Sequence, residues 1–194
     1  MNLTDVLALG AIIFSVLVPL FWIPVHCLTP HFRKLGVLTY VMPAFTWLPV
    51  ALVVYAYREQ ILGFAVDVPW PLRIIGIMTF AAGMLLQLWT LRLLGASGIM
   101  GMPEVTDRIK GRLITAGPFS VIRHPTYASH SMMYAGVFLI TGVTAVAIIT
   151  VLDLLVVITI VIPLEDRELI ARFGDEYRDY RKRVPAFFPL RVRK

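Results

Sequence analysis

The stretch that decides the fold of this 194-residue chain is Ser131–Leu164, SMMYAGVFLITGVTAVAIITVLDLLVVITIVIPL. A bilayer-spanning helix needs roughly 20 apolar residues. At about 1.5 Å per residue, one continuous helix over this stretch would be far longer than the hydrocarbon core is thick. The residues Thr141-Gly142-Val143-Thr144 offer a turn near its centre. The stretch is therefore either one overlong span or two short helices in a hairpin.

Three other apolar stretches are long enough to cross a bilayer, namely residues 6–28, 37–57 and 71–94. The chain is 58% hydrophobic and 15% charged, whereas soluble domains are about one-quarter charged. The net charge of +6 would suggest nucleic acid in a soluble protein. Here the basic residues flank apolar spans, so we expect membrane lipids as partners and no nucleic acid. Because no basic region precedes the first apolar run, we expect no cleaved signal peptide.

The distribution of basic residues decides between one span and two. With five spans and the N-terminus outside, 16 of the 18 Lys and Arg residues are cytoplasmic, and only Arg58 and Arg73 lie outside. Four spans would place the polar loop and the C-terminal basic cluster on opposite sides, against the positive-inside rule. We therefore predict an all-α integral-membrane fold of five transmembrane helices, with the active face and the C-terminus cytoplasmic. The single domain, 1–194, comprises three spans (1–94), a cytoplasmic loop (95–124), a helical hairpin (125–164) and a re-entrant tail (165–194).

The tail is predicted to be amphipathic. From Leu169 to Val184, apolar and aromatic residues recur at spacings of three and four, with charges between them. Gly174 is typical of a helix end, and Asp175 could begin the next helix. We expect this segment to lie along the headgroup layer or to fold back onto the bundle.

One motif lies where the polar loop re-enters the membrane, in the stretch GPFSVIRHPTY, residues 117–127. Pro125 can occupy the first turn of the fourth helix, where its missing N–H costs nothing. Arg123 and His124 then lie at the positive N-terminal end of that helix, which suits an anionic group. The alternative is a positively charged membrane anchor with an interfacial tyrosine, which is common at span ends.

A second motif, Glu165-Asp166-Arg167-Glu168-Leu169, directly follows the last apolar stretch. Acidic residues at membrane depth need partners. A hairpin brings this motif to the same side of the membrane as Arg123 and His124, so an ion pair is expected. The alternative is a solvated first turn of the following helix, where negative charge is favourable.

Together these motifs resemble the isoprenylcysteine carboxyl methyltransferase family, within the wider superfamily that includes phospholipid methyltransferases. The resemblance covers about residues 85–190. It is carried by Leu113-Ile114-Thr115, Gly117-Pro118-Phe119, Arg123-His124-Pro125-x-Tyr127, Glu165-Asp166-x-x-Leu169, Phe173-Gly174-x-x-Tyr177-x-x-Tyr180, Arg183-Val184-Pro185 and Pro189.

The resemblance implies S-adenosylmethionine bound at the cytoplasmic membrane surface, and a lipophilic, lipid or prenylated acceptor. It implies Arg123 and Glu165 as catalytic residues. The implied cofactor residues are Leu113, Ile114 and Gly117 on the adenosine side, His124, Pro125 and Tyr127 on the methionine part, Glu165 on the ribose or the acceptor side, and Leu169 and Tyr177 in a lid.

Val161 departs from the family pattern. Isoprenylcysteine enzymes place an arginine four residues before the glutamate that matches Glu165, and this chain has Val161 there. The acceptor therefore stays open between a carboxylate, an amine and a thiol. Two further alternatives are an NADPH-dependent lipid reductase, because membrane steroid reductases share a related His-Pro-x-Tyr signature, and a non-catalytic membrane scaffold.

Two weaker candidates lie outside the motifs. Asp153 falls within the last apolar stretch, where an ionisable residue suggests a functional site. It could pair with His130 or Gln87, or be protonated with a hydroxyl partner. His26, Cys27 and His31 include potential metal ligands, but a fourth ligand at a sensible spacing is missing, so we expect no metal site.

Overall fold

The computed structural model describes residues 1–106 and 111–189, and all the named elements in these ranges are helical. Five basic residues counted in the charge argument lie outside the described residues: Arg108, Lys110, Arg191, Arg193 and Lys194.

The N-terminal third forms two long, interrupted helical rods. Asn2 caps α1 (Leu3–Ser15), because its side chain accepts from the Asp5 amide while the Asp5 carboxylate accepts from the Asn2 amide. α2 (Leu17–Cys27) continues after one residue, and Pro24 lies inside it. The chain then turns through α3 (Thr29–Leu35) and the 3-10 helix η1 (Gly36–Val41) into α4 (Met42–Ala56). The short helix α5 (Arg58–Gly63) follows.

Helix extends further into the predicted cytoplasmic loop than expected. α6 covers Trp70–Ile99, and Gly95 within it has a non-helical backbone with φ 71° and ψ 170°. After Gly101, α7 (Met102–Val105) adds a further turn. The 95–124 segment therefore contains helix, and the chain changes direction inside it at Gly95. Glycine adopts a positive φ readily because it has no Cβ.

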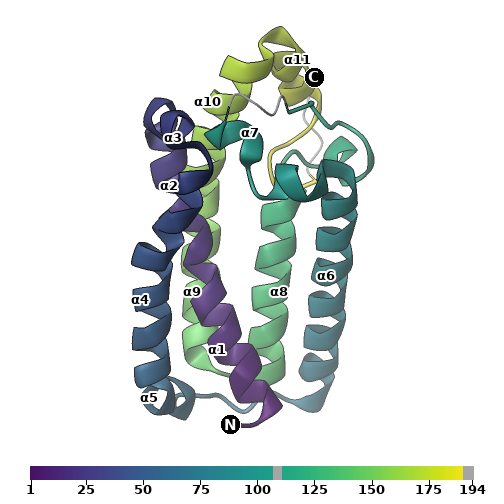
Figure 1. The fold of residues 1–194 in the computed structure, drawn as a ribbon. Coiled ribbons are helices and arrows are strands. Elements are labelled where there is room, and N and C mark those ends of the chain that lie inside the picture. The colour runs from purple at the N-terminus through teal and green to yellow at the C-terminus, as the bar shows by residue number, and fades with distance from the viewer. Residues whose placement is uncertain (107–110, 190–194) are drawn as a thin grey trace.

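The decisive stretch turns back near its centre. α8 (Pro125–Thr141) ends at Gly142, whose φ of 74° suits glycine, and α9 (Thr144–Val156) then runs back beside α8 (Figure 1). The turn is bonded to the residues after α5, with Val66 N donating to Gly142 O and Thr144 N donating to Phe64 O, both at 2.9 Å.

The last helices continue from α9 into the tail. A π-helical segment, η3 (Val157–Val161), leads into α10 (Ile162–Phe173). Pro163 has no N–H for the helical ladder, and such π-bulges are often found at functional sites. α10 ends at Gly174, where the sequence predicted a helix end, and α11 covers Asp175–Arg183.

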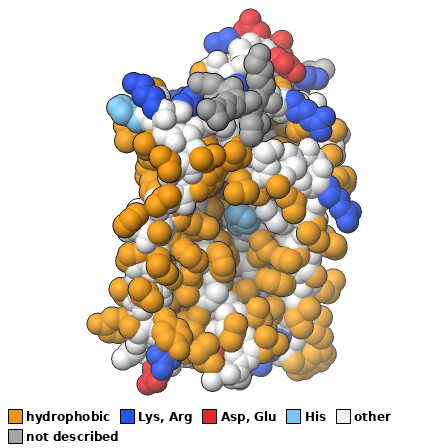
Figure 2. All heavy atoms as spheres, viewed as in Figure 1, with side chains coloured by type: hydrophobic (Ala, Val, Ile, Leu, Met, Phe, Trp, Pro, Cys, Tyr) orange, Lys and Arg blue, Asp and Glu red, His pale blue; other side chains and the backbone are white. Residues whose placement is uncertain are grey.

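Four helical segments are long and apolar enough to cross a membrane: Leu3–Cys27, Thr29–Ala56, Trp70–Val105 and Thr144–Phe173. α8, at 17 residues, is shorter than these four. Large apolar side chains cover the side of the bundle, and charged side chains gather at its two ends (Figure 2). Such a surface fits an integral-membrane protein, because lipid tails and not water can cover it.

Glycines bring α6 and α8 into close contact. A Cβ on Gly136 would lie 2.7 Å from both Gly76 O and Phe80 N, and a Cβ on Gly83 would lie 2.8 Å from Ser129 O. Small residues at such positions let two backbones approach closely, as is typical of membrane helices. This packing fixes the N-terminal end of α8, and hence the Arg-His-Pro motif, next to the end of α6.

Candidate functional site

The site forms where segments far apart in the sequence meet at one end of the bundle. There α7, α10 and α11 gather above the first turn of α8, opposite the end that carries the N-terminus (Figure 1). The residues after α11 bond directly to the Arg-His-Pro motif. Arg123 N donates to Pro185 O at 2.9 Å, and His124 N donates to Ala186 O at 3.0 Å. The tail therefore folds back onto the start of α8.

Asp166 is the centre of the contacts between the two motifs. Its carboxylate accepts from Arg123 Nη2 at 2.8 Å and lies 3.1 Å from His124 Nε2. It also accepts from the Tyr177 hydroxyl and lies 3.5 Å from Arg181 Nε. The expected ion pair between the two motifs is thus present, and it is buried. Breaking a buried, hydrogen-bonded pair of this kind on one side is costly.

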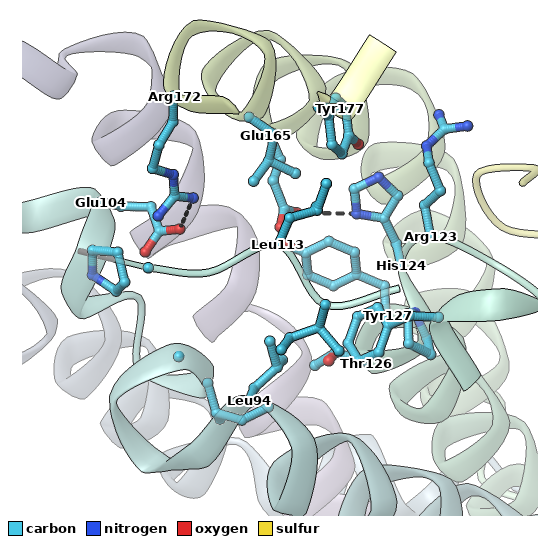
Figure 3. A pocket seen from close by; sticks show the side chains of 18 of the residues that line it. Leu94, Glu104, Leu113, Arg123, His124, Thr126, Tyr127, Glu165, Arg172 and Tyr177 are labelled. Carbon is cyan, nitrogen blue, oxygen red and sulfur yellow. Dashed lines mark hydrogen bonds and ion pairs between the residues drawn. The ribbon is translucent and has the colours of Figure 1, made fainter. Parts of the chain in front are cut away.

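The Arg123 side chain binds the tail and does not point into the cavity. Its guanidinium donates to Val184 O at 2.7 Å as well as to Asp166, and Figure 3 shows it pointing away from Glu165. The structure therefore places the predicted catalytic Arg123 at the cavity's edge, with its charge directed into the tail.

His124 lies between two carboxylates. Its Nδ1 is 3.3 Å from Glu165 Oε2, a distance that makes an ion pair without the alignment of a hydrogen bond, and its Nε2 faces Asp166. Burial opposes a charge on the ring, but Glu165 and Asp166 outweigh burial and raise the pKa of His124 to about 9. The site therefore holds an imidazolium at neutral pH.

A cavity of about 210 Å³ adjoins these residues. Leu113 and Leu94 supply apolar walls, and Tyr127 and Thr126 lie near its membrane side (Figure 3). The predicted site residues that line it are Leu113, Ile114, Arg123, His124, Pro125, Tyr127, Glu165, Leu169 and Tyr177. Gly117 is not among its lining residues. With a φ of 60°, Gly117 packs where a Cβ would meet Leu93 and Trp89, so its backbone shapes the segment instead.

Two lining residues with charges escaped the sequence analysis. Arg172 Nη2 lies 2.6 Å from Glu104 Oε1 and 2.8 Å from Glu168 Oε2, and Figure 3 shows the Glu104–Arg172 pair across the cavity from His124. Glu104 follows the redirecting glycines, in a segment that the sequence predicted as a loop, where nothing local marks a buried carboxylate. The motif at 165–169 includes Glu168, but not its partner Arg172.

Several buried polar atoms around this cavity have no hydrogen-bond partner among the described residues. They include Glu104 Oε2, Glu165 Oε2, Arg172 Nε and both ring nitrogens of His26. His26 stacks on Trp22, with ring centroids 5.3 Å apart, and both residues line the cavity. Buried polar groups are normally satisfied. This cluster therefore fits a ligand that carries both hydrogen-bond donors and acceptors, and positive as well as negative groups.

Of the weaker candidates, His26 belongs to this cluster, whereas Asp153 does not line the cavity. Asp153 is buried on α9, but neither of its expected partners bonds to it. Gln87 Oε1 accepts from Ser129 Oγ at 2.6 Å, and His130 Nδ1 has no partner in the described ranges. Across residues 1–106 and 111–189, no group of three His, Cys, Asp or Glu side chains is arranged to hold a metal ion. Val161 is fully buried and packs in a cluster with Val18 and Tyr127.

Comparison with known proteins adds an independent line of evidence. Residues 72–176 match the family model described as phospholipid methyltransferase. The cobalt-zinc-cadmium resistance protein CzcN of Cupriavidus metallidurans is 36% identical over 85 residues, 44% of this chain and 39% of that protein. Methanethiol S-methyltransferase 1 of Bradyrhizobium diazoefficiens is 32% identical over 106 residues, covering 48% of this chain and 34% of that protein.

A fungal relative extends the comparison. Protein-S-isoprenylcysteine O-methyltransferase of Schizosaccharomyces pombe is 32% identical over 78 residues, 40% of this chain and 33% of that protein. The chain thus spans only about a third to two-fifths of the length of these relatives. No solved structure matches. The family match covers more than half of the chain and contains both motifs that meet at Asp166, so this protein belongs to the phospholipid methyltransferase family, with the isoprenylcysteine methyltransferase-like features that its motifs indicated.

Proposed function

We propose that this protein is an integral-membrane methyltransferase that uses S-adenosylmethionine and acts on a lipophilic acceptor. One observation carries the proposal. The Arg-His-Pro motif and the Glu165-Asp166 motif meet at one cavity, and several buried polar atoms around it have no hydrogen-bond partner among the described residues. S-adenosylmethionine is zwitterionic, with a ribose diol and an apolar adenine, so it offers groups that match those atoms.

Each part of the cavity has a proposed role in holding this cofactor. Leu113, Ile114 and Leu169 supply apolar wall for the adenine. Glu165 accepts from the ribose hydroxyls. On the opposite side, Arg172 and Glu104 match the carboxylate and ammonium groups of the methionine part, and the charged ring of His124 faces them across the cavity.

When bound, the cofactor supplies a methyl group on a sulfonium, which is transferred by in-line displacement without a metal. The chain's contribution is then alignment and exclusion of water. Alignment of two reactants can supply about 7–11 kcal/mol of the barrier. The aromatic face of Tyr127, which is buried beside His124 with ring centroids 5.9 Å apart, can favour a cation by about 0.5–2 kcal/mol.

The proposed topology has five spans, with α8 as the fourth and α9 with η3 as the fifth. The support is that α8 and α9 lie side by side with a turn at Gly142, and that basic residues then gather on one side. Single cysteines at positions 112 and 182, with Cys27 replaced by serine, test it in oriented vesicles. Labelling of both from the same side supports five spans, and labelling from opposite sides overturns them.

Calorimetric titration of the purified protein with S-adenosylhomocysteine tests the function. We expect micromolar binding to the wild type, and at least tenfold weaker binding for His124→Gln and Glu165→Gln. The matched controls are His31→Gln and Glu176→Gln, since both residues are exposed, belong to neither motif and do not line the cavity. These two variants should bind S-adenosylhomocysteine as the wild type does.

Absence of binding to the wild type overturns the proposal and favours a membrane scaffold. Binding of NADPH in place of S-adenosylhomocysteine would instead favour a lipid reductase. Equal binding by all four variants would show that the cofactor lies elsewhere.

A further inference from the structure

A second cavity, of about 860 Å³, adjoins the first and lies between the end of α2, α3, α7 and α10. Three of its described lining residues are exposed, namely Cys27, Arg167 and Ala171, so this cavity is open to the surface. The first cavity is more enclosed, because Arg112 is the one exposed residue among the described residues that line it. The two neighbouring cavities therefore differ in their access to the outside.

The two cavities share a wall. Five residues line both of them: His26, Pro103, Gly111, Arg172 and Phe173. The guanidinium of Arg172 packs closely in this wall, since a Cβ on Gly111 would lie 3.0 Å from Arg172 Nη1 and 3.1 Å from Pro103 Cβ. The same guanidinium lies over the ring of Phe173, 5.0 Å from the ring centroid. A long, flexible side chain is thus a central part of the wall.

A chain of ion pairs holds Arg172 in place. Glu104, whose Oε1 lies 2.6 Å from Arg172 Nη2, lines the first cavity and not the second. Glu168, whose Oε2 lies 2.8 Å from the same nitrogen, lines the second cavity and not the first. Arg33 on α3 also lines only the second cavity, and its Nη2 lies 3.4 Å from Glu168 Oε1. The ion pairs therefore cross from one cavity to the other.

The second cavity lies on the side from which a water-soluble cofactor arrives. In the proposed topology it is at the cytoplasmic end of the bundle, because α2 and α3 meet at Leu28 and the last apolar stretch ends at Leu164, which lines this cavity. Arg33 and Arg167 also line it, and charged side chains of this kind favour contact with water over lipid. The wall at Arg172 separates this cavity from the proposed cofactor site.

Resting on the proposed methyltransferase function, we propose that the second cavity is the aqueous entrance to the cofactor site and that Arg172 is its gate. When Arg172 leaves the wall, the cavities join and the cofactor or its product passes. When the ion pairs form again, the site closes and excludes water, as gating side chains and loops do in other enzymes. Glu168 is a positioning residue, because it holds the guanidinium in the closed position from outside the cofactor site.

Cys27 offers a way to block this entrance without changing the sequence. It is the single cysteine of the chain, is exposed, and lines the second cavity but not the first. Labelling of Cys27 with a bulky maleimide should lower both the association rate and the dissociation rate of radiolabelled S-adenosylhomocysteine at least tenfold. The dissociation constant should not change, because a blocked passage slows entry and exit equally.

Three controls locate the effect. Cys27→Ser treated with the same maleimide should exchange S-adenosylhomocysteine as the unlabelled wild type does. In the Cys27→Ser background, labelled His31→Cys should also exchange at the wild-type rate, because His31 is exposed on α3 and lines neither cavity. Labelled Arg112→Cys, in the same background, tests the other exposed position. Exchange that is slowed at Arg112→Cys and unchanged by the label on Cys27 overturns the proposed entrance, and so does equal slowing by the label at His31→Cys.

Glu168→Gln tests the gate. It removes the charge that holds Arg172 and keeps the size of the side chain, so the gate should open more often. We expect the association and dissociation rates of S-adenosylhomocysteine to rise together by roughly tenfold, the scale of one charge-assisted hydrogen bond, with an unchanged dissociation constant. Glu176→Gln is the matched control, since Glu176 is exposed on α11 and lines neither cavity.

The outcomes separate this proposal from the proposed function. Wild-type rates in Glu168→Gln, or a change in the dissociation constant without faster association, overturn the gate. Normal binding with unchanged rates in the protein labelled at Cys27 overturns the entrance and leaves the methyltransferase proposal standing. Absence of S-adenosylhomocysteine binding by the unlabelled wild type overturns both.

Discussion

Replacing Asp166 with asparagine should release the tail from the membrane bundle. Asp166 is buried, and its carboxylate contacts four side chains from the Arg-His-Pro motif and α11: Arg123, His124, Tyr177 and Arg181. Asparagine keeps the shape but removes the charge, and thereby leaves the buried guanidinium of Arg123 without its anion.

The size of the effect follows from these contacts. Removing one partner of a buried ion pair costs about 3–5 kcal/mol. Because Arg123 retains its bond to Val184 O at 2.7 Å, we expect the lower end, about 3 kcal/mol. At 1.36 kcal/mol per tenfold change, the equilibrium for docking of the tail should shift by roughly 150-fold.

Hydrogen exchange measures this shift directly, since exchange of protected amides reports local opening. In Asp166→Asn, amides of α11 should exchange roughly two orders of magnitude faster than in the wild type, whereas those in the middle of α8 should not change. Asp179→Asn is the control, because Asp179 lies on α11 in an exposed pair with Lys182. If the α11 amides of Asp166→Asn exchange at the wild-type rate, Asp166 does not hold the tail on the bundle.

Three further predictions test other parts of the account. The pKa of His124 is raised to about 9 from 6.5, so its stabilising contribution should be complete below about pH 6.5 and be lost as pH rises through about 9. The melting temperature, measured between about pH 6 and pH 10, should therefore fall as pH rises. This fall should be smaller in His124→Gln. Gly136→Ala should lower stability by about 1–3 kcal/mol, because its Cβ would lie 2.7 Å from the backbone of α6, whereas Gly63→Ala, with open space around it, should not; chemical denaturation compares the two, and equal stability would contradict the packing. Val161→Arg should lower the melting temperature and fail to confer methylation of prenylcysteine analogues, since Val161 is fully buried in an apolar cluster; a stable, active variant would show that the cluster can open for a carboxylate.

Much of the site could be predicted because its chemistry is concentrated in two short motifs. Proline and glycine mark turns and helix starts locally, so Pro125, Gly142 and Gly174 each indicated where an element begins or ends. Pairing of Arg123 and His124 with the acidic motif followed from charge, because buried carboxylates need partners. These signals act over a few residues and are legible in a single sequence.

Other parts depend on long-range packing and could not be predicted. Glu104 and Arg172 are far apart in the sequence, and the redirection of the chain at Gly95 and Gly101 brings Glu104 on α7 to Arg172 on α10. Arg123 has the residue type expected of a catalytic group, but its direction is set by the carbonyl of Val184, whose position depends on the folded tail.

Photolabelling with radiolabelled S-adenosylmethionine tests the central claim most directly, namely that residues 111–127, α10 and the start of α11 together form one cofactor site. Ultraviolet irradiation of the complex, followed by peptide mapping, should place the label within residues 111–127 and 162–177, and excess S-adenosylhomocysteine should suppress it. Specific label confined to α4 and α5, or no label that S-adenosylhomocysteine suppresses, would contradict the account.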